Sequence, residues 1–350
     1  ATLSDLPAQP PQPVPATLSF QYGESGTRTN IEASFNDVEA ALYRPSNREA
    51  RLVVEPRNPQ RPEINLLSRL LVNHMQEFEL QNAGVVSVFI LDLQTGDDVA
   101  IKPDVPMSGI DLLKVPIVLE TYRRLDRPPT LSQQALISET LVTRPDYESA
   151  NQLLNVIAGA DDPYRGAEMV TETMQRLGLV NTFMVAPYDA DPLASRRTLE
   201  TPANSQESIL TSPDPVMQTT VEDIGMLLSM IYYCAEDGSG TLMAVLAGDV
   251  TQAECQDMLQ IMAQNQIGSL IEEGVPPQTA VAHRHGWVSD THGDAGIVFS
   301  PGGDYVIAQM LYKPDWLEWE LSSPLLADMS RAAYNYFNFD SPYLSNTQTN

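Results

Sequence analysis

The chain has 350 residues, of which 43% are hydrophobic and 19% charged, a composition typical of a globular protein with one or two domains. It carries 46 acidic and 20 basic residues, so its formal net charge is −26. A surface this negative repels nucleic-acid phosphates and anionic membrane surfaces, and we expect neither as a partner. No stretch approaches the roughly 20 apolar residues of a membrane-spanning helix, so no transmembrane span is expected.

The chain begins with a proline-rich, polar stretch at residues 1–18, which we interpret as an extended tether, like the linker behind a removed signal peptide or lipid anchor. Residues 19–60 contain short β-prone runs broken by Asn, Gly and Pro, which indicate a small β-rich segment or an arm on the main body. This arm is a candidate for self-assembly or for contact with a surface partner. We expect the main domain at 61–340 and a tail at 341–350.

The main domain is predicted to open with a helix after Pro62, where proline occupies a favoured first-turn position. Five apolar residues recur there at helical spacing: Ile64, Leu67, Leu71, Met75 and Phe78. A two-stranded hairpin with its turn at 95–97 follows, and then an apolar helix that begins near residue 111. Helices are predicted to dominate from 131 to 177.

An irregular region rich in Pro, Ser, Asn and Asp spans 187–219, and so long a loop is usually functional or disordered. Two helices follow, each opened by a capping-box pattern, Thr220 with Asp223 and Thr251 with Glu254. Cys234 and Cys255 lie on these two helices, so a disulfide is plausible if the protein is exported; the alternative is two buried thiols.

Strands return at the end of the chain, at 279–289, 293–300 and 305–314, before a closing helix at 324–337. Strands at both ends of the main domain therefore enclose a helical middle. The pattern predicts an α+β fold in which one antiparallel sheet is built from both ends of the domain, with a helical lobe inserted between them.

Three short segments resemble the class A serine β-lactamases and their penicillin-binding relatives: "DLLK" at 111–114, "PDYESANQLL" at 145–154 and "HRHGW" at 283–287. That family carries Ser-x-x-Lys, Ser-Asp-Asn and Lys-Thr-Gly in this order. The resemblance extends over roughly residues 84–339, and it implies a β-lactamase/transpeptidase-like fold. The loop at 187–219 lies where the family has its Ω-loop. The family requires no cofactor, and we expect no metal.

The first segment keeps the lysine of the family pattern, Lys114, but has Asp111 in place of the serine nucleophile. A carboxylate beside a lysine is favoured in its charged form and is a weak nucleophile toward an amide. Its attack would give an anhydride rather than a slowly hydrolysed ester. Taken without the resemblance, Asp111 is a helix cap that forms an i, i+3 ion pair with Lys114, and we favour this interpretation over a catalytic base.

The other two segments also depart from the family pattern. Pro145 replaces the serine that relays protons, Asp146 is retained, and Tyr147 replaces the asparagine that would hold the substrate amide. Arg284 and His285 replace Lys and Thr in the third segment. Arg284 keeps a positive charge that suits a carboxylate, and the resemblance places the oxyanion-hole amides at Asp111 and Trp287.

Several residues outside the matched positions have competing interpretations. Ser108 is a candidate substitute nucleophile, but it lies off the helical face of Lys114 and reads as a turn residue. His283 and His285 are a weak candidate metal pair, since no third ligand is in sight. Trp316 and Trp319 are expected to cover the core rather than to bind a sugar. Glu200 is the nearest acid in sequence to the family's water-activating glutamate.

These departures favour an exported β-lactamase-like pseudoenzyme, a non-catalytic binding or structural protein at the bacterial cell surface. A candidate ligand for its cleft is an anionic peptide or a cell-wall-like molecule. The alternative is an active β-lactamase or D-Ala-D-Ala peptidase-type hydrolase with a rearranged site, which the retained Lys114 motivates.

Overall fold

A five-stranded antiparallel sheet forms the centre of the computed structural model, in the order β10–β11–β12–β5–β6. The first part of the domain supplies β5 (Val85–Asp92) and β6 (Asp98–Ile101), and the last part supplies β10 (Ala280–Trp287), β11 (Thr291–Phe299) and β12 (Tyr305–Tyr312). This topology confirms the predicted α+β fold. The structure describes residues 5–15, 18–21, 23–57, 61–142, 147–190, 197–206, 208 and 210–344.

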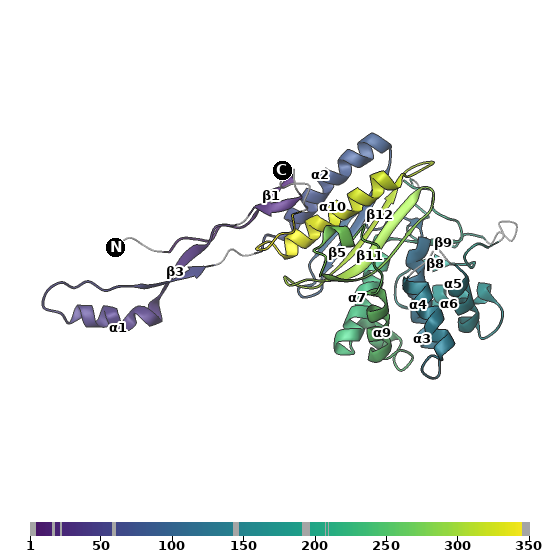
Figure 1. Cartoon of the computed structure of the whole chain (residues 1–350), viewed down its shortest axis with the longest axis horizontal. Coiled ribbons are helices and arrows are strands. Elements are labelled where there is room, and N and C mark those ends of the chain that lie inside the picture. The colour runs from purple at the N-terminus through teal and green to yellow at the C-terminus, as the bar shows by residue number, and fades with distance from the viewer. Residues whose placement is uncertain are drawn as a thin grey trace.

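Helices cover both faces of the sheet, so its central strands β11, β12 and β5 are buried on both sides (Figure 1). On one face lie α2 (Ile64–Asn82) and α10 (Trp319–Phe337), which pack against each other. Side chains that alternate along β12 divide between two apolar cores, with Ile307 facing α2 and α10 and Ala308 facing the helical lobe.

The helical lobe lies on the other face and is built from the chain between β6 and β10 (Figure 1). Its helices are α3 (Lys114–Arg124), α4 (Leu131–Val142), α5 (Glu148–Ala158), α6 (Pro163–Arg176), α7 (Val221–Asp237), α8 (Gly240–Val245) and α9 (Gln252–Met262), with the short 3-10 turn η2 (Ile110–Leu113) before α3. A second 3-10 turn, η4 (Glu272–Gly274), packs on α10 instead. A small sheet in the order β7 (Met107–Ser108), β9 (Met217–Thr219), β8 (Phe183–Met184) joins the lobe to the start of η2. The segment predicted as one irregular loop therefore ends in a strand.

The predicted disulfide is present and links Cys234 of α7 to Cys255 of α9. The hydroxyl of Thr251 caps α9 in a complete capping box with Glu254. Thr220 caps α7 by accepting the backbone N–H of Asp223, but the carboxylate of Asp223 accepts instead from the backbone of Asn181 at 2.8 Å and from Thr182 at 3.0 Å. Only one of the two predicted boxes is therefore complete among the described residues.

The closing helix is longer than predicted, because α10 begins at Trp319 and Pro324 lies inside it. A proline removes a single hydrogen bond, to the carbonyl four residues earlier, and near the N-terminus of a helix that loss is tolerated. In α2, the predicted stripe faces the core: Leu67, Leu71, Met75 and Phe78 are buried. Pro62 lies before the N-cap residue Glu63, so the prediction that it occupies the first turn of α2 is wrong. Apolar spacing predicts the extent of both helices better than the prolines do.

The N-terminal part forms an arm that extends away from the sheet and the lobe (Figure 1). Its strands are β1 (Gln12–Val14), β2 (Ser19–Gln21), β3 (Gly26–Asn30) and β4 (Val53–Arg57), paired as β1–β2 and β3–β4. The first pair lies against α2 and α10. Between β3 and β4 the chain forms α1 (Ile31–Leu42), a helix that the sequence analysis did not predict.

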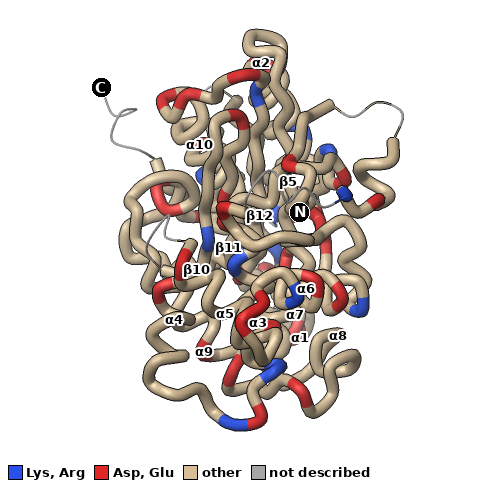
Figure 2. The backbone as a smooth tube through the Cα atoms, turned by 90° about the vertical axis from the view of Figure 1, so that its right-hand side faces the viewer, with Lys and Arg blue, Asp and Glu red and all other residues tan. Residues whose placement is uncertain are grey.

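Acidic positions are spread over both the sheet region and the helical lobe, with fewer basic positions among them (Figure 2). Among the described residues, no helix has the length and apolar character needed to span a membrane.

Candidate active-site cleft

Asp111 lies inside the 3-10 turn η2, immediately before the buried helix α3. The N-cap position of η2 is Gly109 and that of α3 is Leu113, and neither helix start has a side-chain capping hydrogen bond. The expectation that Asp111 caps its helix is therefore wrong. The reason is that its carboxylate is directed at two cations instead of at the backbone N–H groups of the next turn.

Two buried cations hold the carboxylate of Asp111. Its Oδ2 atom lies 3.2 Å from Nζ of Lys114 and 2.5 Å from a terminal nitrogen of Arg284. The predicted i, i+3 ion pair with Lys114 is therefore present, and Arg284 adds a second pair across 173 residues of sequence. The side chains of Lys114 and Arg284 are 0% and 2% exposed, so water screens these pairs only weakly.

Arg284 also joins the sheet to the helical lobe. Its second terminal nitrogen donates to the backbone carbonyl of Leu141, at the end of α4, at 3.3 Å. Its Nε atom is buried and has no partner among the described residues. The guanidinium is thus engaged with protein acceptors at both of its ends.

A pair of tyrosines forms the wall behind Lys114. Tyr147 and Tyr188 stack face to face, with ring centroids 4.8 Å apart, and Nζ of Lys114 lies 5.2 Å and 5.7 Å from those centroids. This is a cation–π geometry. Burial, followed by the charge of Asp111, raises the pKa of both hydroxyls, so both tyrosines are neutral at physiological pH. The pair therefore offers hydroxyl donors rather than a base.

Tyr188 also fixes the backbone next to Asp111. Its hydroxyl donates to the carbonyl of Ile110 at 2.8 Å, and Ile110 has a φ of 44°, a left-handed conformation that is strained for a β-branched residue. Two hydrogen bonds of 3.0 Å between the side-chain amide of Asn151 and the backbone of Tyr188 hold the ring in place. No sequence motif predicted these contributions of Tyr188 and Asn151.

Strand β10 passes directly against the turn that carries Asp111. A Cβ atom at Gly286 would lie 2.6 Å from the backbone nitrogen of Asp111 and 2.7 Å from its Cβ atom, so only glycine fits there. The close approach brings the backbone of Trp287, the next residue, to the same end of the cleft as that of Asp111. The two backbone donors expected for an oxyanion hole therefore belong to neighbouring segments.

The two histidines of β10 lie in different environments. Burial lowers the pKa of His285 to about 4, and its Nδ1 atom accepts from the side-chain amide of Asn265 at 3.2 Å. Burial alone would also lower the pKa of His283, but the carboxylates of Asp294 and Glu272 outweigh it and raise that pKa to about 9. His283 is thus charged and bridges the two acids. Its Nδ1 atom lies 2.8 Å from a carboxylate oxygen of Asp294, and its Nε2 atom lies 3.2 Å from one of Glu272.

Two further predictions concern a metal pair at His283 and His285 and core-covering roles for Trp316 and Trp319. Among the described residues, no group of three or more potential ligands is arranged to hold a metal. Trp316 is 61% exposed and Trp319 is half-buried, where its ring contacts Trp287. The expectation that Trp316 covers the core is therefore wrong.

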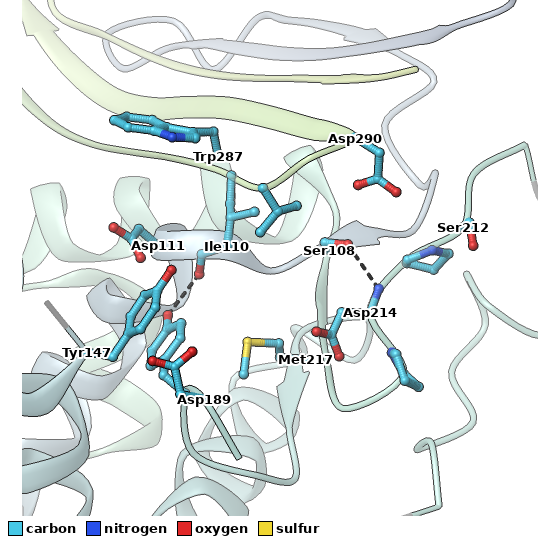
Figure 3. A pocket seen from close by; sticks show the side chains of 14 residues that line it. Ser108, Ile110, Asp111, Tyr147, Asp189, Ser212, Asp214, Met217, Trp287 and Asp290 are labelled. Atoms are coloured by element: carbon cyan, nitrogen blue, oxygen red, sulfur yellow. Dashed lines mark hydrogen bonds between the residues drawn. The ribbon is translucent and has the colours of Figure 1, made fainter. Parts of the chain in front are cut away.

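Two adjoining cavities, of about 390 and 380 Å³, share Asp111, Tyr147 and Trp287 as lining residues. Figure 3 shows the first cavity, with Trp287 and Asp290 on one side and Tyr147, Asp189 and Met217 on the other. Its described lining residues include no lysine or arginine but four aspartates: Asp111, Asp189, Asp214 and Asp290. Amide side chains and Arg284 line the second cavity together with His285.

The other predicted candidates lie away from Lys114 or outside the described residues. Ser108 is buried in β7, where its hydroxyl accepts the backbone N–H of Asp214 at 2.9 Å (Figure 3). Glu200 is 76% exposed and pairs with Arg197 on the surface. Pro145 and Asp146 of the second segment lie outside the described residues.

The chemistry available at the cleft depends on three of its described polar groups: Asp111, Lys114 and His285. The position next to Lys114 that would attack holds a carboxylate, which already accepts from two cations. His285 lies on the adjoining strand and is neutral near pH 7. The backbone donors at Asp111 and Trp287 would face a negative charge at Asp111, which repels a developing oxyanion.

Comparison with solved structures finds the same fold in PBP-A and in several β-lactamases. A mutant of PBP-A, captured as an acyl-enzyme with penicillin G, is 18% identical, with 80% of this chain and 99% of that chain covered and a TM-score of 0.59. A β-lactamase from Sphaerobacter thermophilus is 15% identical, with coverage of 77% and 97% and a TM-score of 0.57. One from Xanthomonas campestris pv. campestris is 16% identical, with coverage of 77% and 98% and a TM-score of 0.57.

No curated protein matches the chain in sequence. Residues 70–154 and 162–337 match the Beta-lactamase2 family, described as a β-lactamase enzyme family. This match covers well over half of the chain and includes the turn of Asp111, the helical lobe and strand β10. Together with the sheet topology, it shows that the chain belongs to this β-lactamase family.

Proposed function

We propose that the protein is a non-catalytic member of its family, an exported binding or structural protein. The observation that supports this proposal is the position of the Asp111 carboxylate between Lys114 and Arg284, at 3.2 and 2.5 Å. A hydroxyl nucleophile in acyl transfer gives its proton to a neighbouring base and forms an ester. A carboxylate is a weak nucleophile toward an amide carbonyl, and its attack would form an anhydride instead.

Export is supported by the disulfide between Cys234 and Cys255, because disulfides persist in oxidising compartments such as the periplasm and the cell exterior.

We further propose that the cleft keeps a binding role. An anionic peptide or a cell-wall-like molecule remains the candidate ligand, with Arg284 as its cation. Such a ligand has to displace Asp111 from Arg284 or share the guanidinium with it, since the two are paired in the structure. Its carboxylate also has to compete with the negative charge of the neighbouring cavity. Binding is therefore expected to be weak and sensitive to salt.

The test is covalent labelling with a fluorescent penicillin, read on a denaturing gel and by mass spectrometry of the intact chain. We expect no labelling of the natural protein, and an adduct on any residue would overturn the proposal. Asp111→Ser is the matched variant: if it is labelled, this one position accounts for the loss of acylation. If it is not labelled although circular dichroism shows it to be folded, the residues at Pro145, Tyr147, Arg284 and His285 are implicated as well.

The alternative, an active hydrolase with a rearranged site, is motivated by the fully buried Lys114 beside the cleft. It predicts hydrolysis of a chromogenic cephalosporin that is lost in Lys114→Ala. No hydrolysis by the natural protein, or equal hydrolysis in that variant, would reject this mechanism.

A further inference from the structure

Helix α1 of the arm carries a row of exposed apolar side chains. Ile31, Phe35 and Leu42 are 78%, 59% and 64% exposed, and Val38 lies half-buried between them. The spacing of four, three and four residues places all four on one side of an α-helix. We call Ile31, Phe35, Val38 and Leu42 the α1 stripe. In a globular protein, such a stripe normally faces a packed partner.

The arm itself does not cover this stripe. The buried residues of α1 are Ser34 and Ala41, on the side that faces β4, where the hydroxyl of Ser34 accepts the backbone N–H of Val53 at 2.8 Å. Every residue of β4 is exposed. A 12-residue helix and a two-stranded hairpin are each marginally stable in water. The arm therefore needs a further surface to be well ordered, and α1 extends away from the body (Figure 1).

The stripe is complementary to a second copy of itself. In an antiparallel pair of α1 helices related by a twofold axis, the centre lies between residues 36 and 37. Ile31 then lies opposite Leu42 of the second copy, and Phe35 opposite Val38 of the second copy. Both contacts join side chains at the same height along the pair, as in an antiparallel coiled coil. A spacing of four, three and four residues is the same in both directions, which an isologous interface requires.

The charges of the arm favour a copy of the arm over the acidic body. Residues 23–57 contain six acidic and five basic residues, so this segment has a formal charge of −1 in a chain of −26. Helix α1 itself has three acidic residues and no basic one, so this balance comes from the arginines that flank the helix, and two arms repel each other less than two bodies do. In the antiparallel pair, Arg44 of one copy also lies within about one helical turn of Glu32 of the other, where opposite charges attract.

We propose that the protein forms a twofold dimer through antiparallel packing of α1 against α1 of a second copy. Each stripe residue contributes on the order of 100 Å² of side-chain surface, so the two helices bury roughly 800 Å² together, below the size of a standard stable interface. The dimer is therefore expected to exchange with monomer in the micromolar range. This inference deepens the structural part of the proposed function and does not depend on the cleft.

Sedimentation velocity of the full-length chain tests the proposal, over protein concentrations from about 1 to about 200 µM. We expect the mass to rise toward a dimer with concentration. Phe35→Asp places a charge at the centre of the interface and should weaken association at least about tenfold. Leu80→Asp is the matched control, because Leu80 lies on α2, outside the arm, and is 86% exposed. This variant should associate like the natural protein. A monomer throughout, or a dimer that Phe35→Asp leaves intact, would overturn the proposal.

Cross-linking tests the orientation. The two cysteines of the chain are joined in the disulfide, so one added cysteine is a unique thiol. Under mild oxidation, a mixture of Ile31→Cys and Leu42→Cys chains should cross-link faster than either variant alone, because these positions face each other. Faster cross-linking of each variant with itself indicates parallel helices and contradicts the antiparallel pair. Either failure leaves the penicillin result unaffected, so the two proposals can fail separately.

Discussion

Removing the charge of Asp111 is expected to destabilise the whole domain. In Asp111→Asn, the side chain keeps its size and can still accept a hydrogen bond from Arg284, but the negative charge is lost. Lys114 and Arg284 are 0% and 2% exposed, so neither can regain water in the folded state. A buried ion left without its partner costs about 3 to 5 kcal/mol. We therefore expect the free energy of unfolding to fall by about 3 kcal/mol or more.

Urea unfolding followed by far-UV circular dichroism measures this loss as a lower midpoint at an unchanged slope. In a thermal melt, the same loss lowers the midpoint by about 6 °C or more. Asp189→Asn is the control, because Asp189 lines the same cavity but is exposed, and its effect should stay within about 0.5 kcal/mol. Equal stability of the two variants would show that the ion pairs at Asp111 make no net contribution, and the structural role assigned to them would be refuted.

Three further predictions concern stability away from Asp111. Replacing Cys234 and Cys255 with Ala opens a loop of 21 residues and should lower the free energy of unfolding by about 3 kcal/mol, and an unchanged urea midpoint would contradict this. Burial raises the pKa of Asp223 to about 6, so the native state binds this proton more tightly than the unfolded state does. The free energy of unfolding should therefore fall by up to about 3 kcal/mol as the pH rises from 4 to 6, and Asp223→Asn should remove that decline. The pKa of His283 is raised to about 9, so the stabilisation from its charge is complete below about pH 6.5 and is lost as the pH rises to 9. The free energy of unfolding, measured with urea at pH 6 and at pH 9, should therefore differ less in His283→Gln than in the natural protein.

The sequence was sufficient to predict the fold because apolar periodicity and three short segments agreed with each other. The hairpin of β5 and β6, the strands β10 to β12 and the helices α4 to α7 occur where they were expected, whereas α8 was not predicted. Helix α1 was missed for a physical reason. Its apolar residues are spaced for a helix, but they are interrupted by acidic residues and followed by Pro45, and the side chains that reveal it face solvent rather than a core.

The site was predicted less completely than the fold. The ion pair of Asp111 with Lys114 was expected because the two residues are separated by three positions, a spacing that can be read along the chain. The contact with Arg284 depends on how β10 packs against η2, and the hydroxyl of Tyr188 reaches Ile110 from a loop 78 residues away. Neither contact has a local sequence signal. The contact with Arg284 places the carboxylate of Asp111 between two cations, which its position near a helix start did not predict.

The two ion pairs of Asp111 also determine which substitutions the cleft can accept. A serine at position 111 would leave the charges of Lys114 and Arg284 without their common counterion. A neutral residue at position 284 would in turn remove one of the two cations that hold Asp111. Each single substitution is therefore expected to lower the stability of the domain. Positions 111 and 284, on separate segments of the chain, are coupled, and their effects on stability should not be additive.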